Sequence, residues 1–222
     1  MTELSCRLRD RDVRYQVGTS GYVVGRKKWQ KMPCLNCLEL NSTFYHLPSK
    51  QLTKSLMNLP PNVSLIVKAS QQITHYSRLK NVKQLWLTLW NRIKDIPNLK
   101  CVLFQLPPTF TMNEENMNRI RILKTYVPTS VDIAIEFRNN SWLVERTYEM
   151  FKELNWCIVG TLIVKRPSTR WVGNMPPGLF MPPRTANYNY VRVHGKKKWR
   201  GLLSSSELSS LHDAVADQVV QT

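Results

Sequence analysis

Short apolar segments rich in β-branched residues recur along this sequence, and longer amphipathic stretches separate them. This alternation is typical of βα units that wind around a parallel sheet. We expect seven strands, at residues 15–20, 38–44, 64–69, 101–106, 132–137, 156–163 and 188–194. We expect helices at residues 50–59, 79–96, 114–126, 144–154 and 206–220. The pattern therefore predicts an α/β protein with a mainly parallel sheet.

The length and the charge of the chain narrow its class. A chain of 222 residues is long enough for one large domain with a sizeable core, and a hydrophobic fraction of 42% excludes a disordered protein. We expect a charged N-terminal segment, residues 1–14, followed by a single domain, residues 15–222. Lysine and arginine number 32 against 15 acidic residues, which leaves a net charge of +17. This charge predicts a polyanionic partner.

No part of the sequence predicts a membrane protein. No apolar run approaches the roughly 18–20 residues that a transmembrane helix needs. Residues 1–14 have no apolar centre of the kind found in secretory signals. The five cysteines are an odd number, so free thiols are favoured over a disulfide framework. We therefore expect a soluble, intracellular protein, and the sequence indicates no oligomeric state.

One stretch breaks the alternation of strands and helices. Residues 165–187 contain five prolines and two glycines, so we expect a long irregular loop there. Two helix starts are marked by capping residues. Ser49 precedes the helix at 50–59, and Ser204 with Glu207 forms a predicted capping box for the helix at 206–220.

Polar side chains gather at the ends of five predicted strands. Side chains alternate between the two faces of a strand, so Glu39 shares a face with Asn41, and Glu136 shares one with Arg138. The polar residues at these strand ends are Glu39, Asn41, Lys68, Gln105, Glu136, Arg138, Arg192 and His194. Because the carboxyl ends of parallel strands meet at one edge, we expect these groups to converge where a (β/α) barrel carries its active site.

Two interpretations of this convergence stay open. The groups form a functional site that prefers an anion, because three cationic residues, Lys68, Arg138 and Arg192, face two carboxylates. Alternatively, they form buried ion pairs that only fix the interior of the barrel. Buried ion pairs contribute little to stability, so we favour the functional interpretation.

These strand ends also carry a resemblance to a known family. The sequences GTSG from Gly18, ELNSTFY from Glu39, VKAS from Val67, LFQLPP from Leu103, IEFR from Ile135 and YVRVHG from Tyr190 are similar, in this order, to motifs of the domain of unknown function 72 family. LPS from Leu47, ITH from Ile73 and SW from Ser141 belong to the same series. The resemblance covers the chain from Gly18 to about residue 211.

The resemblance implies a triosephosphate-isomerase-type (TIM) barrel with these motifs at its catalytic face, and it brings no established reaction. Tyr22 stands where the family usually has Trp, and only 15 residues, 22–36, join the first two strands. No counterpart of the family's closing strand follows Val220. We therefore expect a TIM-like barrel with seven recognisable strands that is incomplete or closes in an unusual way.

The leading functional hypothesis is an enzyme that uses acid–base chemistry on a phosphate-bearing anionic substrate, nucleic acid included. A hydrolase and an enzyme acting on phosphodiesters or sugar phosphates both fit this class. Glu39 or Glu136 would serve as the base, and Lys68, His75 and His194 as proton donors or electrostatic stabilisers. Arg138 and Arg192 would hold the anion, and Asn41 and Gln105 would complete the substrate site.

The alternative is a catalytically inactive module that binds nucleic acid. Two basic clusters with an aromatic residue follow the first and last predicted strands: Arg26, Lys27, Lys28 and Trp29, and Lys196, Lys197, Lys198, Trp199 and Arg200. Lysine and arginine neutralise phosphates, and tryptophan can stack on bases. We predict no cofactor. A divalent metal held by Glu39, His75, Glu136 and His194 is the weaker alternative, because no two of them have a spacing that forces coordination.

Overall fold

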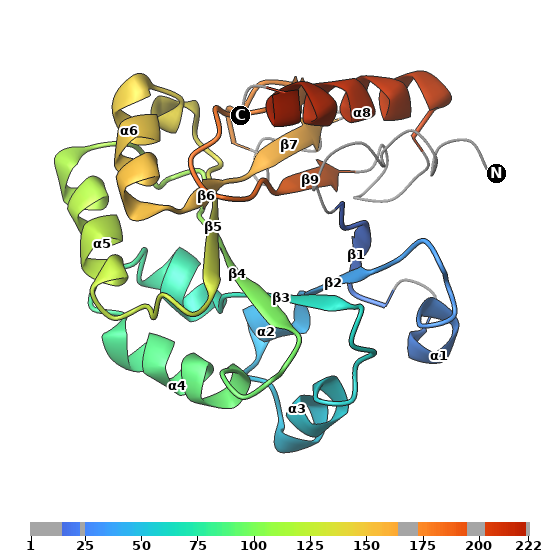
Figure 1. Ribbon diagram of the computed structural model, residues 1–222. Helices are drawn as coiled ribbons and strands as arrows, with labels where there is room; N and C mark the ends of the chain where they lie inside the picture. Colours follow the sequence, from blue (N-terminus) through green and yellow to red (C-terminus); the bar gives the residue numbers. More distant parts are fainter. Residues whose placement is uncertain (1–14, 23–24, 164–172, 195–202, 221–222) are drawn as a thin grey trace.

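The computed structural model describes residues 15–22, 25–163, 173–194 and 203–220. The fold is α/β, as the alternation predicted. Six parallel strands form the main sheet in the order β1-β2-β3-β4-β5-β6 (Figure 1). These strands are β1 (Gly18–Ser20), β2 (Cys37–Leu40), β3 (Ser64–Lys68), β4 (Leu99–Gln105), β5 (Asp132–Glu136) and β6 (Cys157–Ile158). Residues 1–14 lie outside the described residues, so the predicted N-terminal segment stays a prediction.

A second sheet continues from the end of the first. It has the order β8-β7-β9 and consists of β7 (Gly160–Ile163), β8 (Gly178–Phe180) and β9 (Val191–His194). Strand β9 runs parallel to β7, and β8 runs antiparallel to it. The single strand predicted at residues 156–163 is therefore two strands. The chain changes partner at Val159, so β6 pairs with β5 whereas β7 pairs with β9.

The loop predicted at residues 165–187 is partly wrong. Residues 164–172 lie outside the described residues, but Gly178–Phe180 is strand β8, which covers one edge of β7. Only three apolar residues, 179–181, stand between Gly178 and Pro182, so no alternation of apolar and polar residues predicted this strand. Gly178 has φ +86°, a backbone conformation that favours glycine at the entry to this strand.

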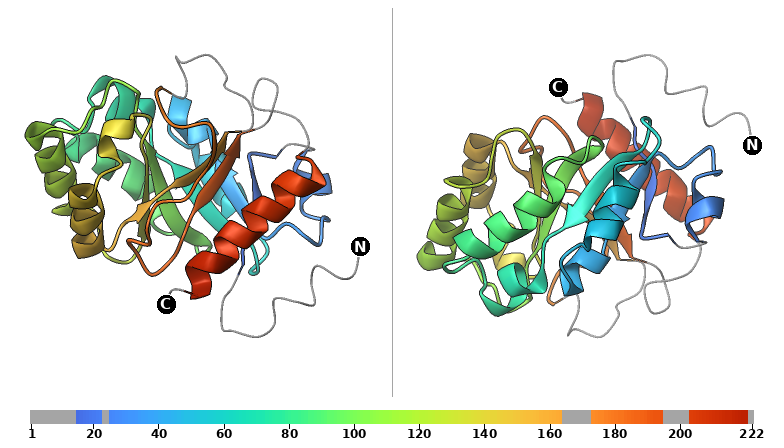
Figure 2. Two further views of the ribbon diagram at one scale, coloured as in Figure 1. Left: turned by 90° about the horizontal axis from the view of Figure 1, so that it is seen from above. Right: turned by 90° about the horizontal axis from the view of Figure 1, so that it is seen from below.

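A closed barrel is not confirmed. Among the described residues, no strand ladder joins β9 to β1. Each of the seven predicted strand segments overlaps a strand, and the two sheets together have nine strands among these residues, because residues 156–163 form two and β8 was not predicted. Helix α8 (Ser205–Val220) lies alongside β7 and β9 (Figures 1 and 2). Its residues Ser206, Ser210 and Leu211 line a small cavity together with Leu162 of β7 and Leu179 of β8. Within the described part of the chain, no helix is long and apolar enough to span a membrane.

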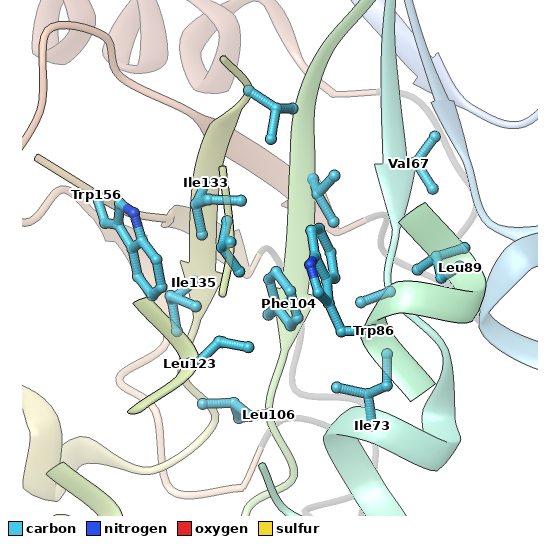
Figure 3. Close-up of a cluster of buried hydrophobic side chains, with 14 of the residues drawn as sticks. Val67, Ile73, Trp86, Leu89, Phe104, Leu106, Leu123, Ile133, Ile135 and Trp156 are labelled. Atoms are coloured by element: carbon cyan, nitrogen blue, oxygen red, sulfur yellow. The ribbon is translucent and has the colours of Figure 1, made fainter. Parts of the chain in front are cut away.

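The remaining helices cover the outer face of the main sheet (Figures 1 and 2). They are α1 (Arg26–Trp29), α2 (Ser42–Tyr45), α3 (Lys50–Leu56), α4 (Lys83–Ile93), α5 (Glu114–Lys124) and α6 (Glu145–Leu154). The main core lies between these helices and the sheet. Figure 3 shows Trp86 and Leu89 of α4 beside Val67 of β3 and Phe104 of β4, all fully buried. Trp86 still satisfies its indole nitrogen, which donates to the carbonyl of Tyr126 at 3.2 Å.

Both predicted caps are confirmed. The Ser49 hydroxyl accepts a hydrogen bond from the Leu52 amide at 3.1 Å, which starts α3. At α8, the Ser204 amide donates to the Glu207 carboxylate at 2.6 Å, and the Glu207 amide donates back to the Ser204 hydroxyl at 3.3 Å. Each bond satisfies an amide that the first helical turn would leave without a partner.

Most element boundaries differ from the prediction by a few residues, and two of the differences lie beside the polar strand ends. The strand predicted at 38–44 ends at Leu40, and the next residues form α2. The helix predicted at 79–96 spans only Lys83–Ile93, and a π-helix, η1 (Gln72–Tyr76), precedes it. Between this π-helix and α4, residues Arg78, Leu79 and Asn81 have positive φ angles of 48°, 61° and 54°. Burial of the Leu79 side chain holds this unfavourable backbone in place.

Candidate functional site

The inner face of the sheets has an apolar layer and a polar layer. The apolar layer consists of Cys37, Ile66, Cys101, Leu103, Ala134, Cys157, Val159 and Ala186, with Tyr188 and Tyr190 packed against it. The four described cysteines are free thiols, and Cys34 alone among them is exposed. Glu39 and Glu136 point to this inner side, whereas Leu38 and Ile135 belong to the outer core. The predicted division of these strands into two faces is therefore confirmed.

Glu136 occupies the centre of the polar layer. Its side chain is fully buried, and one oxygen accepts from Arg138 Nη2 at 2.6 Å. The other oxygen accepts from Gln105 Nε2 at 2.9 Å and from Arg192. His194 Nε2 lies 3.5 Å from the first oxygen. Burial alone would raise the pKa of Glu136, but the neighbouring Arg138 and Arg192 outweigh it and hold the pKa well below its ordinary value.

Glu39 is bound as tightly, by residues of β1 and of β9 and its flank. Arg192 donates from Nε at 2.8 Å and from Nη2 at 2.7 Å, one bond to each carboxylate oxygen. The Ser20 hydroxyl donates at 2.7 Å, and the Tyr190 hydroxyl donates as well. Burial alone would raise the pKa of Glu39, but the charge of Arg192 and the hydrogen bonds from Arg192, Tyr190 and Ser20 together lower it below its ordinary value. Arg192 therefore joins both carboxylates across the space between β9, β2 and β5.

Lys68 ends β3 beside this pair of carboxylates. Its Nζ donates to Gln105 Oε1 at 2.9 Å, and Nζ lies 4.2 Å from the centre of the Phe44 ring. The same Gln105 side chain donates to Glu136, so Gln105 connects the lysine to the carboxylate. Burial lowers the pKa of Lys68 to about 8, and the positive charge of Arg192 contributes to the shift. A substantial fraction of the amine is therefore neutral near physiological pH.

His75 comes from the π-helix η1 and lies against the same phenylalanine. Its ring centre is 4.9 Å from that of Phe44, and its Nδ1 lies 2.9 Å from the Thr74 hydroxyl. Burial lowers the pKa of His75 from 6.5 to about 4, and the nearby Lys68 and Arg138 add to the effect. The imidazole is therefore neutral at physiological pH.

A pH titration of stability tests this environment of His75. The unfolded chain binds a proton at this histidine between pH 6.5 and about 4 while the folded chain does not, so stability is lost as the pH falls through this range. The His75→Gln variant lacks this contribution. The difference in free energy of unfolding between wild type and variant is expected to shrink steadily from pH 6.5 towards 4 in urea titrations. A constant difference would contradict the shift. His46→Gln, at an exposed histidine, is the matched control.

The polar layer opens into a cavity of about 1640 Å³ that follows the inner face of the sheets. Eight of the predicted site residues line it: Glu39, Asn41, Lys68, His75, Gln105, Arg138, Arg192 and His194. The ninth, Glu136, is buried behind them and is reached through its ion pairs. Asn41 donates to the Ser20 hydroxyl, and Tyr45 and Tyr76 lie exposed at the edge of the cavity. The structure thus brings all nine residues together, and their chemical roles stay predictions.

Three parts of this site escaped the sequence analysis. Ser20 and Tyr190 bind Glu39, and Phe44 contacts Lys68 and His75. Tyr190 was open to prediction, because it has the same spacing of two as Arg192 and His194 and so shares their face. The π-helix that carries His75 had no sequence signal, although such helices often mark functional sites.

The described residues offer no set of ligands for the divalent metal considered above. Within the described part of the chain, no group of three or more His, Cys, Asp or Glu side chains is arranged to hold a metal ion. Glu39 and Glu136 instead direct their oxygens at Arg192 and Arg138.

The first basic cluster does not have the predicted form. Trp29 is fully buried, and its indole nitrogen donates to the Thr19 hydroxyl at 2.6 Å, so the prediction that it stacks on a base is wrong. Arg26 Nη2 donates to the carbonyl of Ser55 at 2.9 Å. Lys27 and Lys28 are on α1, and the second cluster, 196–200, lies outside the described residues. Trp29 packs inward because it is the last residue of a short helix that covers β1.

The arrangement of strands and motifs agrees with a comparison of families. The model of a family described as protein of unknown function DUF72 matches residues 31–221. The chain belongs to the DUF72 family. The resemblance found in the sequence motifs is thereby confirmed, and the family's description assigns no activity.

The chain is also similar to individual proteins, two of which have crystal structures of the same fold. The UPF0759 protein YunF of Bacillus subtilis (strain 168) is 27% identical over 173 residues, which are 72% of this chain and 59% of YunF. A crystal structure of a DUF72 family protein from Thermotoga maritima MSB8 is 27% identical, with a TM-score of 0.70 over 86% of this chain and 76% of that one. A DUF72 family protein from Enterococcus faecalis V583 is 20% identical, with a TM-score of 0.68 over 83% and 78%.

Proposed function

We propose that the polar layer binds a small, phosphate-bearing substrate and acts on it by acid–base chemistry. The observation that carries this proposal is the excess of positive over negative side chains in the polar layer. Three cationic side chains, Lys68, Arg138 and Arg192, face the two carboxylates of Glu39 and Glu136. Arg138 and Arg192 form ion pairs with the two carboxylates, whereas none of the described ion pairs involves Lys68. The anionic oxygens of a phosphate group would compensate this one remaining positive charge through charge-assisted hydrogen bonds.

The acid–base role falls to Lys68 in this proposal. Glu39 and Glu136 were predicted as candidate bases, but arginines hold both pKa values low, which makes each carboxylate a weak proton acceptor. Lys68 has a pKa of about 8, so it exchanges protons near neutral pH. His75 lines the same cavity and is neutral, but its pKa of about 4 makes it a weak proton acceptor as well, so it contributes a neutral hydrogen-bonding group. The carboxylates then serve to hold Arg138 and Arg192 in fixed positions.

Calorimetric titration with inorganic phosphate and glycerol 3-phosphate tests the proposal, and glycerol is the uncharged control ligand. We expect both phosphates to bind and glycerol not to bind. Lys68→Met is expected to weaken phosphate binding about tenfold or more, because a charge-assisted hydrogen bond contributes about 1.5–3 kcal/mol. The matched control is Lys100→Met, since Lys100 is the second residue of β4, at the other end of this strand from Gln105, and lines the same cavity.

The result that would overturn the proposal is equally direct. If neither phosphate binds, or if both variants bind as the wild type does, the polar layer is not an anion site. The ion pairs of Glu39 and Glu136 would then be structural, as the second interpretation of the sequence holds. Conversion of bound sugar phosphates, followed by phosphorus NMR with Lys68→Met as the inactive reference, then tests the catalytic part of the proposal.

A further inference from the structure

Lys68 differs from the other cations of the site in what surrounds its charge. Arg138 and Arg192 each donate to a buried carboxylate at the site. Lys68 Nζ instead has a neutral amide oxygen, Gln105 Oε1, at 2.9 Å and an aromatic face, Phe44, at 4.2 Å. Its side chain is buried, yet it forms part of the cavity wall. The amine is therefore both shielded from bulk water and accessible to a molecule in the cavity.

This environment activates a lysine as a nucleophile. An ammonium group is destabilised by burial and by neighbouring positive charge, and Lys68 experiences both, from its burial and from Arg192 and Arg138. Lysines desolvated in this way, or placed next to another cation, are the ones that react with carbonyl compounds. An acid–base role requires only that Lys68 can exchange a proton. Covalent reaction requires in addition that its nitrogen is held at the cavity wall, and Gln105 supplies this restraint.

Gln105, which restrains the Nζ atom of Lys68, is itself held in place by a hydrogen bond. Gln105 donates through Nε2 to Glu136 at 2.9 Å, and this bond orients its Oε1 towards Lys68. Glu136 is in turn held by Arg138 and Arg192. Gln105 is thus a positioning residue that presents the amine at a defined point of the cavity wall.

We propose that Lys68 forms an imine with a carbonyl substrate that also carries a phosphate group. This inference rests on the proposed function, since the phosphate-binding site is what would bring the carbonyl to the amine. The nitrogen lone pair of the neutral amine attacks the carbonyl carbon, and one N–H proton passes to the carbonyl oxygen to give a carbinolamine. A proton from solvent then allows this oxygen to leave as water, and the nitrogen keeps one proton in the resulting iminium ion.

Borohydride trapping tests the imine. The protein is incubated with dihydroxyacetone phosphate, and hydride from sodium borohydride reduces the iminium carbon to a stable secondary amine that peptide mass spectrometry locates. We expect Lys68 to be labelled at least about tenfold more than Lys100, because burial lowers the pKa of Lys68 to about 8 and so increases its neutral amine fraction near pH 7.5. Dihydroxyacetone, which lacks the phosphate, is expected to label Lys68 weakly. Lys68→Arg keeps the charge and is expected to lose the label at this position while still binding inorganic phosphate.

The outcomes separate this inference from the proposed function. If inorganic phosphate binds but the label is spread evenly over the lysines, the imine proposal is wrong and the anion site stands. If dihydroxyacetone labels Lys68 as well as its phosphate does, the imine forms without an anion site and the proposed function fails. Gln105→Leu adds a check on positioning. It is expected to reduce the labelling of Lys68 more than it reduces phosphate binding, and an unchanged labelling rate would contradict the positioning role.

Discussion

Replacing Glu136 by Gln is expected to lower the free energy of unfolding by about 3–5 kcal/mol. Glu136 is fully buried, and its carboxylate compensates Arg138 and Arg192 at the same time. The substitution preserves the shape of the side chain but leaves two buried guanidinium groups with only Glu39 to compensate them. Urea denaturation of wild type and variant at one pH measures this difference.

The control for this experiment is an acidic residue in an exposed ion pair. Glu115 pairs with Arg119 one helical turn away, and its side chain is 70% exposed, so Glu115→Gln is expected to cost less than about 1 kcal/mol. If Glu136→Gln costs as little as the control, the buried network does not hold the inner face together. If the variant keeps most of its stability but loses phosphate binding, Glu136 acts mainly in the site.

The stability argument and the functional argument concern the same residues. Ion pairs in a protein interior rarely stabilise more than well-packed apolar residues would, because both charges must be stripped of water. An interior built for stability alone would therefore continue the apolar layer of Cys37, Ile66 and Cys101 up to the strand ends. In this protein the apolar layer is instead replaced by charged groups at the carboxyl ends of the strands, where Lys68 and His75 line the cavity. The excess of positive charge at that end is what an anion site requires and what a purely structural network does not explain.

The sequence predicted the residues of the site better than it predicted the boundaries and pairing of the strands and helices around them. Strand periodicity places alternate residues on one face, so Glu39, Glu136 and Arg192 could be assigned to a common edge from spacing alone. Family motifs lie at the same strand ends, and the family match confirms the resemblance. The predicted face of each strand is the one observed. A shift of one residue in strand register would move Leu38 out of the core and bury a charged side chain without a partner.

The features that escaped prediction depend on contacts between distant parts of the chain. Residues 156–163 form one apolar run, and only the choice of partners, β5 for Cys157 and β9 for Gly160, divides it into two strands. The burial of Trp29 depends on Thr19, ten residues earlier, whose hydroxyl accepts the indole hydrogen bond. The π-helix that presents His75 depends on Leu79, which adopts a positive φ angle in order to be buried. None of these choices follows from local propensity.

Replacing Arg192 by Met is expected to reverse the pH dependence of stability above about pH 4.5. In the wild type Arg192 is the main charge that lowers the pKa of Glu39, and it also lowers that of Glu136. Their contribution to stability is therefore complete above the unfolded pKa and is lost as the pH falls. Without Arg192, burial raises the pKa of Glu39 above its unfolded value, so the folded variant binds a proton that the unfolded chain does not. The variant then becomes more stable as the pH falls from about 7 to about 5.

The size and the sign of this effect can be measured together. Near neutral pH the variant is expected to be about 3–5 kcal/mol less stable than the wild type, because two buried carboxylates lose their shared cation, and this deficit is expected to shrink at about pH 5. Arg146→Met is the control, since Arg146 pairs with the exposed Glu114 and neither side chain is buried. A deficit that stays constant over the same pH range would mean that Glu39 is not held ionised by Arg192. The charge balance behind the anion site would then be wrong, because it requires both carboxylates to be ionised when Lys68 carries the excess positive charge.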